Sequence, residues 1–212
     1  MVNTSLHLLD PRTIAAIGQF DKHAQAYQQA LRHKRPVADL RRFAALARRG
    51  DLVLDAGCGP ASDLRILVDL GLHPVGVDLS EGVLAEARML LPRHPLVRAP
   101  LQALPFRARS FGGLWLSGTM NHLRRDEWRS TLDACMGLLE RGPVYFSCIR
   151  GQRDLEEVED PILGRIHRSD ATEDEVKELL GSYGLSDLTV EVRPDPILDR
   201  RRPWIVALGR RL

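Results

Sequence analysis

The sequence has no apolar stretch that approaches the roughly 20 residues needed to span a bilayer. The apolar residues near its start, Leu6 to Leu9, are too few and too interrupted for a signal peptide. Its three cysteines, Cys58, Cys135 and Cys148, lie far apart and show no paired spacing with histidine. These absences predict a cytoplasmic protein with no membrane segment, disulfide or bound metal.

The chain also lacks a large excess of charge of one sign, because its formal net charge is only +2. Its basic residues form short clusters, such as His33 to Arg35 and Arg200 to Arg202, and we expect the second to be a solvated turn. Nucleic-acid binders usually carry a denser basic stripe, so a nucleic-acid partner is not favoured. We find no repeat, low-complexity tract or linker, and 212 residues fit a single domain over 1–212. Nothing in the sequence indicates the oligomeric state.

Two helices are predicted in a helical extension over residues 1–50. Asp10 followed by Pro11 supplies an N-cap and a first-turn proline, after which apolar residues recur at helical spacing. Pro36 opens the second helix, and Gly50 can adopt the left-handed conformation that ends it.

From Asp51 the pattern changes to short apolar strands that alternate with helices, which is typical of a parallel α/β sheet. The predicted strands are 52–55, 75–78, 96–98, 114–116 and 144–148. The predicted helices between them are 63–70, 81–91 and 126–139. This cofactor-binding core would span residues 51–150.

The remaining segment, 151–212, is predicted to contain one more helix and two more strands. Its acidic stretch, Asp154 to Asp160, is expected to be a solvated loop or a short helix. Thr172 and Glu175 form a capping box that opens a helix ending near Gly181. Strands are expected over 188–192 and 204–208.

The run VLDAGCGP, residues 53–60, stands where a buried strand turns into a helix. Glycines at such a turn let a ligand approach the backbone, as in dinucleotide-binding folds. Asp55 is the discriminating residue, because a carboxylate just before the turn would repel a pyrophosphate but suits the ammonium and sulfonium of S-adenosylmethionine. The third glycine of the dinucleotide fingerprint is also absent, since Ser62 occupies its position.

Asp78 ends the second predicted strand, 21 residues after Gly57. A carboxylate at this position can accept hydrogen bonds from both ribose hydroxyls of an adenosine ligand. Nicotinamide enzymes use the same arrangement, so Asp78 indicates an adenosine-type ligand without choosing between cofactors. The alternative is a purely structural role for Asp55 and Asp78, as carboxylates that cap a helix or stabilise a turn.

Together these motifs resemble the class I S-adenosylmethionine-dependent methyltransferases, in the small-molecule subgroup related to ubiquinone and menaquinone methyltransferases. The resemblance is carried by VLDAGCGP (53–60), VGVDLS (75–80), LQALPF (101–106) and SF (110–111). It implies a Rossmann-like three-layer αβα sandwich with a seven-stranded, mostly parallel sheet whose last strand is antiparallel.

The resemblance also implies roles for matching positions. Gly57, Cys58 and Gly59 would approach the methionine part, Asp78 the ribose, Leu79 the adenine face, Leu101 and Gln102 the adenine edge, and Ser117 the methyl group. Pro100 stands where relatives often have an aspartate that accepts a hydrogen bond from adenine, so recognition would depend on the Leu101 amide and the Gln102 side chain. Gly112 is a second departure.

Several residues outside the motifs are candidates for acceptor chemistry. His122, just after the fourth strand, is placed where a general base could act, with a structural loop histidine as the alternative. Tyr27 could belong to a lid over the cofactor or pack in the core. Arg150 and His167 could contact an acceptor, although a surface position is the simpler interpretation. Cys58 is expected to be a packing residue, not a nucleophile.

The sequence therefore predicts methyl transfer from S-adenosylmethionine to a small-molecule acceptor. An RNA or protein methyltransferase is a second hypothesis, which the low net charge disfavours. A nicotinamide oxidoreductase is a third, disfavoured by Asp55 and Ser62, and a non-catalytic cofactor binder is a fourth.

Overall fold

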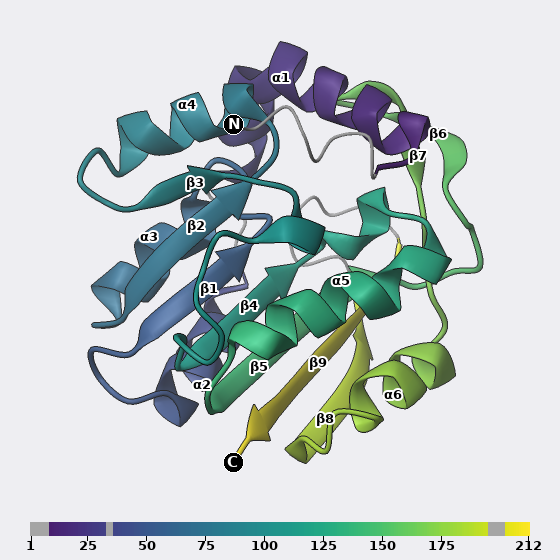
Figure 1. The fold of residues 1–212 in the computed structure, drawn as a ribbon. Coiled ribbons are helices and arrows are strands. Elements are labelled where there is room, and N and C mark those ends of the chain that lie inside the picture. The colour runs from purple at the N-terminus through teal and green to yellow at the C-terminus, as the bar shows by residue number, and fades with distance from the viewer. Residues whose placement is uncertain (1–8, 33–35, 195–201) are drawn as a thin grey trace.

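A seven-stranded sheet forms the centre of the computed structural model, which describes residues 9–32, 36–194 and 202–212 (Figure 1). The strands lie in the order β3 (Leu96–Arg98), β2 (His73–Asp78), β1 (Leu52–Ala56), β4 (Gly113–Ser117), β5 (Gly142–Ile149), β9 (Trp204–Arg211) and β8 (Ser186–Arg193). Strands β1 to β5 pair in parallel, whereas β9 is antiparallel to both β5 and β8. The predicted sheet, including its antiparallel last strand, is confirmed.

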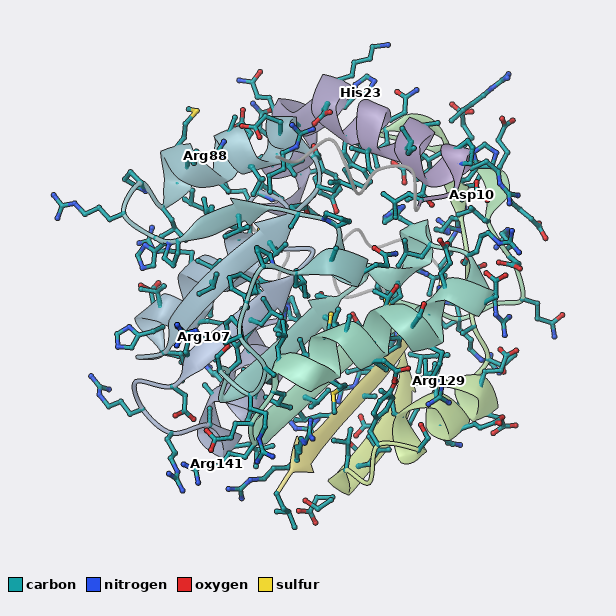
Figure 2. The ribbon with its side chains drawn as sticks, viewed as in Figure 1. Asp10, His23, Arg88, Arg107, Arg129 and Arg141 are labelled. Atoms are coloured by element: carbon teal, nitrogen blue, oxygen red, sulfur yellow. The ribbon has the colours of Figure 1, made fainter. Side chains whose placement is uncertain are left out.

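Helices cover both faces of this sheet and complete three layers. The long helices and short 3₁₀ turns are α1 (Pro11–Leu31), α2 (Val37–Leu46), α3 (Ser62–Asp69), α4 (Glu81–Leu90), η2 (Leu101–Ala103), η3 (Met120–His122), α5 (Arg125–Leu138) and α6 (Glu173–Gly181). Helices α5 and α6 share one apolar cluster with the sheet, and α2 and α3 share another on the opposite face. Charged side chains such as Arg88 and Arg141 are exposed at the periphery (Figure 2). None of the helices within the described ranges combines the length and apolar character needed to cross a membrane.

The central strands are apolar on both faces because helices cover both. On β4, Leu114 and Leu116 belong to the α5 side, and Trp115 between them faces α2 and α3. The Trp115 ring stacks on Tyr145 of β5 with 3.7 Å between centroids, and its Nε1–H donates to Asp63 Oδ2 at 3.1 Å. Successive side chains of a strand point to opposite faces of the sheet. Because helices cover both faces, every position is buried, which explains the uninterrupted apolar runs in the sequence.

Helix α1 lies across the carboxyl edge of the sheet and contacts α4 and strand β7 (Gly164–Arg168) (Figure 1). Asp10 caps it by accepting a hydrogen bond from the Arg12 amide at 2.8 Å, as predicted. Further along, Asp21 Oδ1 accepts from Ser80 Oγ at 2.5 Å and from the Gly82 amide at 2.8 Å. These bonds attach α1 to the start of α4.

The acidic stretch 154–160 corrects the sequence prediction of a loop or short helix. Residues Glu156–Asp160 form strand β6, which pairs antiparallel with β7 (Gly164–Arg168) in a separate hairpin. The Asp160 side chain stabilises the turn between β6 and β7, because its Oδ1 accepts hydrogen bonds from the Ile162 and Leu163 amides at 2.9 and 3.1 Å. Leu163 and Ile166 then pack against α1. The two segments are far apart in the chain, so no local sequence pattern indicates this contact.

Replacing Thr172 by alanine should lower the free energy of unfolding by about 1 kcal/mol, because the capping box of α6 would lose its side-chain acceptor. In the structure Glu175 Oε2 accepts from the Thr172 amide at 2.7 Å, and Thr172 Oγ1 accepts from the Glu175 amide. Thr172→Ser keeps the hydroxyl and should stay close to the unaltered protein in urea unfolding. Equal midpoints for the alanine and serine variants would contradict the assignment.

Candidate active site

Two adjoining cavities open at the carboxyl edge of the sheet, where β1, β2 and β4 end. We call the one that reaches β7 the hairpin cavity and the one that reaches η2 the η2 cavity. Both are lined by Phe20, Tyr27, Gly57, Gly59, Ser117, Gly118 and His122. The two cavities therefore join beside the tips of β1 and β4.

The glycine turn after β1 is held by backbone hydrogen bonds to the neighbouring strand. The Gly57 and Cys58 amides both donate to the Val77 carbonyl, at 2.8 and 2.9 Å. Gly57 has a φ of +80°, and a Cβ at this position would overlap the side chain of Thr119. Glycine is thus required both by the backbone conformation and by the close approach of the β4 end.

Asp78 joins the tips of β1 and β2. Its Oδ2 accepts from the Gly59 amide at 2.9 Å, and its Oδ1 accepts from the Ser80 amide at 2.9 Å. Burial raises the pKa of the Asp78 carboxyl, while the hydrogen bonds from Ser80 and Gly59 act in the opposite direction. The side chain lines the η2 cavity, where it can accept from ligand hydroxyls.

Two buried carboxylates line the hairpin cavity near the glycine turn. Asp55 is 2% exposed and Asp63, in the first turn of α3, is 3% exposed. Sequence reasoning found Asp55 but missed Asp63, because nothing in the motif distinguishes it from an ordinary helix-start aspartate. Burial, with Asp55 and Asp78 nearby, raises the pKa of the Cys58 thiol, which suits a packing role better than a nucleophilic one.

The η2 cavity has an apolar wall and an unused polar group. Leu79, Pro100 and Leu101 line it together with Gln102. The Gln102 Nε2 atom is buried and has no hydrogen-bond partner within the described part of the chain. A buried amide without a partner is costly, so this atom is available to a ligand.

His122 ends η3 at the junction of the two cavities. Its carbonyl accepts from Thr13 Oγ1 of α1 at 2.8 Å, and its ring meets Phe20 edge-on with 5.0 Å between centroids. Burial, together with the nearby positive charge of Arg168, lowers the pKa of His122 to about 4. Its imidazole is therefore neutral at physiological pH, and its buried Nδ1 has no hydrogen-bond partner among the described residues.

The structure brings together every residue that the sequence assigned to the cofactor or to catalysis. Tyr27, Asp55, Gly57, Cys58, Gly59, Asp78, Leu79, Leu101, Gln102, Ser117 and His122 each line at least one of the two cavities. Tyr27 reaches both from α1, where its ring also packs edge-on against Phe20.

The sequence candidates for acceptor contacts lie elsewhere. Arg150 is exposed beside Glu173, and neither Arg150 nor His167 lines either cavity. The neighbour of His167, Arg168, lines the hairpin cavity instead, because alternate residues of β7 face opposite sides. Arg202 also lines this cavity, which corrects its assignment to a solvated turn. Residues 200 and 201, and the cluster 33–35, lie outside the described residues.

Comparison with known proteins agrees with this geometry. Residues 53–142 match the family model described as "Methyltransferase domain". The malonyl-[acyl-carrier protein] O-methyltransferase of Enterobacter lignolyticus (strain SCF1) is 28% identical over 190 residues, which cover 86% of this chain and 74% of that protein. The enzyme of the same name from Pseudescherichia vulneris is 34% identical over 110 residues, covering 52% and 43%. The chain therefore spans less than half of this second relative.

Solved structures show the same fold. The Burkholderia thailandensis 1,6-didemethyltoxoflavin-N1-methyltransferase, solved with 1,6-didemethyltoxoflavin and S-adenosylhomocysteine, matches with a TM-score of 0.69. Its identity is 23%, and the match covers 95% of this chain and 90% of that chain. The chain is a methyltransferase that resembles the class I S-adenosylmethionine-dependent enzymes. The comparisons support S-adenosylmethionine as its cofactor.

The residues of this methyltransferase fit that cofactor. At Gly59 the turn leaves open space, since only the Tyr27 ring comes within 4 Å of the place where a Cβ would lie. The buried carboxylates Asp55 and Asp63 suit a cationic ligand, and Gln102 offers a buried amide nitrogen without a partner among the described residues. Within the described ranges, no group of three or more histidine, cysteine, aspartate or glutamate side chains could hold a metal ion.

Replacing Asp78 by asparagine should weaken S-adenosylhomocysteine binding about 10- to 100-fold, because charge-assisted hydrogen bonds to the ribose would be lost. Isothermal titration calorimetry measures the effect. Asp69→Asn, at the exposed end of α3, is the matched control and should bind like the unaltered protein. Equal affinity for the two variants would show that Asp78 does not contact the cofactor.

The lowered pKa of His122 predicts a pH-dependent stability. Between pH 4 and 6.5 the unfolded chain binds more protons at this residue than the folded one, so the free energy of unfolding should rise with pH across this window and level off above it. The contribution of His122 is at most about 3 kcal/mol. His122→Gln should flatten the rise in urea unfolding at pH 4.5, 5.5 and 7. If the free energy of unfolding depended on pH in the same way in both proteins, His122 would not be the cause of the rise.

Proposed function

We propose that this methyltransferase transfers the methyl group to an oxygen atom of a small acceptor, which is free or attached to a carrier. The observation that carries the proposal is the junction of the two cavities beside Ser117, Gly118 and His122. The η2 cavity suits the adenosine of the cofactor, and the part of the hairpin cavity beyond the junction remains for an acceptor.

The curated relatives support oxygen as the methylated atom, because both are named as O-methyltransferases of malonyl-[acyl-carrier protein]. The Burkholderia thailandensis neighbour is named as an N1-methyltransferase, and nitrogen is therefore the second candidate atom. That neighbour is only 23% identical and informs on the fold, so we give the curated relatives more weight for the chemistry.

The cofactor, when bound, supplies an electrophilic methyl group on a sulfonium. The chain's own residues would then position the cofactor. Asp78 would hold the ribose, and Gly57, Cys58 and Gly59 the methionine part. Leu79, Leu101 and Gln102 would contact the adenine. In-line displacement depends on alignment and on exclusion of water. The apolar contacts of α1 with Leu163 and Ile166 close one side of the hairpin cavity and support that exclusion.

His122 and Tyr27 complete the proposed site at the junction. A neutral imidazole can accept a proton from a hydroxyl acceptor or donate a hydrogen bond to an oxygen. A cytoplasmic location is part of the proposal, supported by Cys58, Cys135 and Cys148, which are all buried free thiols. An RNA acceptor is disfavoured by the low net charge of +2.

The proposal is tested by turnover of S-adenosylmethionine with a panel of small acceptors that present hydroxyl, carboxyl or amine groups. S-adenosylhomocysteine formation and the mass of the product are measured together. We expect a product 14 mass units heavier, methylated at oxygen, with rates at least 10-fold lower for Asp78→Asn than for Asp69→Asn. Methylation confined to nitrogen acceptors would overturn the assignment of oxygen.

A further inference from the structure

We propose that the acceptor is a carboxylate, held in the hairpin cavity by the guanidinium of Arg168 and the imidazole of His122. This inference rests on the proposed function, since it requires methyl transfer to oxygen. It assigns a substrate class and a specificity-determining residue to the part of the cavity that the cofactor does not need.

Arg168 is a buried cationic residue that lines the hairpin cavity. It is 2% exposed, and its Nε donates to Asp170 Oδ1 at 3.2 Å, while Asp170 itself is fully buried. Asp170 Oδ2 accepts from Arg153 Nη1 at 2.6 Å, so one carboxylate is shared by two guanidinium groups. The Arg153–Asp170–Arg168 group carries a net positive charge. The Arg153 side chain is 42% exposed and meets solvent, whereas the Arg168 side chain is buried at the cavity.

Two polar atoms at this end of the cavity have no partner among the described residues. They are Arg168 Nη2 and His122 Nδ1, and both atoms are buried. Arg168 donates only, and a neutral imidazole donates through one of its nitrogens. An anionic oxygen ligand would satisfy the guanidinium, and the imidazole could bind the same carboxylate group.

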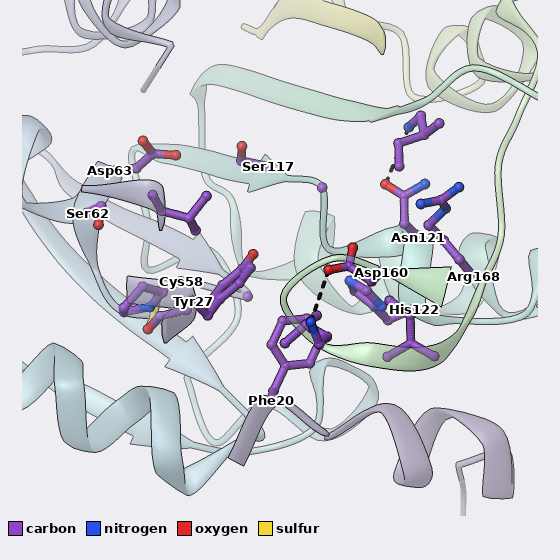
Figure 3. A pocket seen from close by; sticks show the side chains of 18 of the residues that line it. Phe20, Tyr27, Cys58, Ser62, Asp63, Ser117, Asn121, His122, Asp160 and Arg168 are labelled. Atoms are coloured by element: carbon purple, nitrogen blue, oxygen red, sulfur yellow. Dashed lines mark hydrogen bonds between the residues drawn. The ribbon is translucent and has the colours of Figure 1, made fainter. Parts of the chain in front are cut away.

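The position of Arg168 separates it from the methionine end of the cofactor site. Cys58, Ser62 and Asp63 lie at one end of the hairpin cavity, whereas His122 and Arg168 lie at the other, with Ser117 between the two groups (Figure 3). The glycine turn that suits the methionine part is therefore at the opposite end from the guanidinium. An anion at Arg168 would face the junction from the acceptor side.

Two further charged side chains, Asp160 and Arg202, line the same cavity. Asp160 of the hairpin lines the same cavity, but its Oδ1 accepts from two backbone amides of its own turn. Arg202 contributes a second guanidinium to the lining. Counting the Arg153–Asp170–Arg168 group, Asp160 and Arg202, cations exceed carboxylates at the acceptor end, whereas Asp55 and Asp63 make the cofactor end negative.

A carboxylate acceptor also suits the chemistry of the site. One carboxylate oxygen forms the new O–CH₃ bond, the S–CH₃ bond breaks, and its electron pair stays on sulfur. The sulfonium becomes a neutral thioether, the carboxylate becomes a neutral methyl ester, and no proton is released. A general base is then unnecessary, and His122 acts as a hydrogen-bonding group. Loss of the negative charge removes the ion pair with Arg168 and favours release of the product.

The first test uses the unaltered protein. Radiolabelled S-adenosylmethionine is supplied with coenzyme A monothioesters of short dicarboxylic acids, with the corresponding carboxamides, and with phenolic and amine acceptors. Carboxyl methyl esters are recognised because mild base releases labelled methanol. We expect base-labile product from the dicarboxylic thioesters. The corresponding carboxamides should bind at least about 10-fold more weakly, measured as inhibitors of this reaction.

The second test compares Arg168→Gln and Arg168→Lys with Arg165→Gln, a control on the exposed face of the same strand. Arg168→Gln should lower kcat/KM for the carboxylate acceptor about 100-fold, mainly through KM, and Arg168→Lys should restore part of it. Binding of S-adenosylhomocysteine should change less than twofold in all three, which also shows that the variants are folded. Arg165→Gln should match the unaltered protein in both measurements.

Three outcomes would overturn the inference. Methylation of a phenol but of no carboxylate would refute it while leaving oxygen methylation intact. Equal loss of S-adenosylhomocysteine binding and of kcat/KM in Arg168→Gln would place Arg168 on the cofactor. Unchanged kcat/KM in Arg168→Gln would remove it from the site. By contrast, failure of the unaltered protein to bind S-adenosylhomocysteine would refute the proposed function itself.

Discussion

The site depends on the connection that the Asp78 carboxylate makes between the ends of β1 and β2. It accepts one hydrogen bond from the Gly59 amide and another from the Ser80 amide, at 2.9 Å each. The glycine turn and the start of α4 are thereby fixed by a side chain that also faces the η2 cavity. Because a carboxylate has about four acceptor positions, Asp78 can hold the protein backbone and still accept from a ligand. In the proposed site, one residue thus serves both the fold and the cofactor.

The same loop is also attached to the helix above it. Ser80 Oγ donates to Asp21 on α1 and accepts from the Val83 amide at the start of α4. On its other side, α1 packs against the β6–β7 hairpin through Leu163 and Ile166. Helix α1 therefore connects the cofactor side of the site to the acceptor side, and residues from both contribute to the junction at His122.

Electrostatic asymmetry divides the hairpin cavity between its two proposed ligands. Asp55 and Asp63 provide negative charge near the glycine turn, where a cationic cofactor is stabilised. Arg168, supported by Asp170 and Arg153, provides positive charge at the opposite end. A cation and an anion bound at these ends would meet between them, so the charges that select the two ligands also bring the reacting groups together.

Local signals accounted for most of the sheet and for the cofactor side. Short apolar runs identify buried parallel strands, the capping box at Thr172 identifies α6, and the glycine turn with Asp55 and Asp78 identifies the ligand class. The hairpin at 156–168 was not predicted, because an acidic, largely exposed strand lacks the apolar pattern of a core strand. Without that strand, the alternation that separates Arg168 from His167 could not be assigned.

The sequence by itself determined the sheet and the candidate residues for the cofactor, since these depend on periodicity and on motifs within a few residues of each other. Only the tertiary structure decided what lies at the acceptor end. Arg168 and Asp170 come from one segment and His122 from another, and these segments approach one another only in the folded chain, where α1 packs against the hairpin. Burial then changes their chemistry, lowering the pKa of His122 and leaving a guanidinium atom without a partner among the described residues. Desolvation is a property of the packed chain, and no local pattern encodes it.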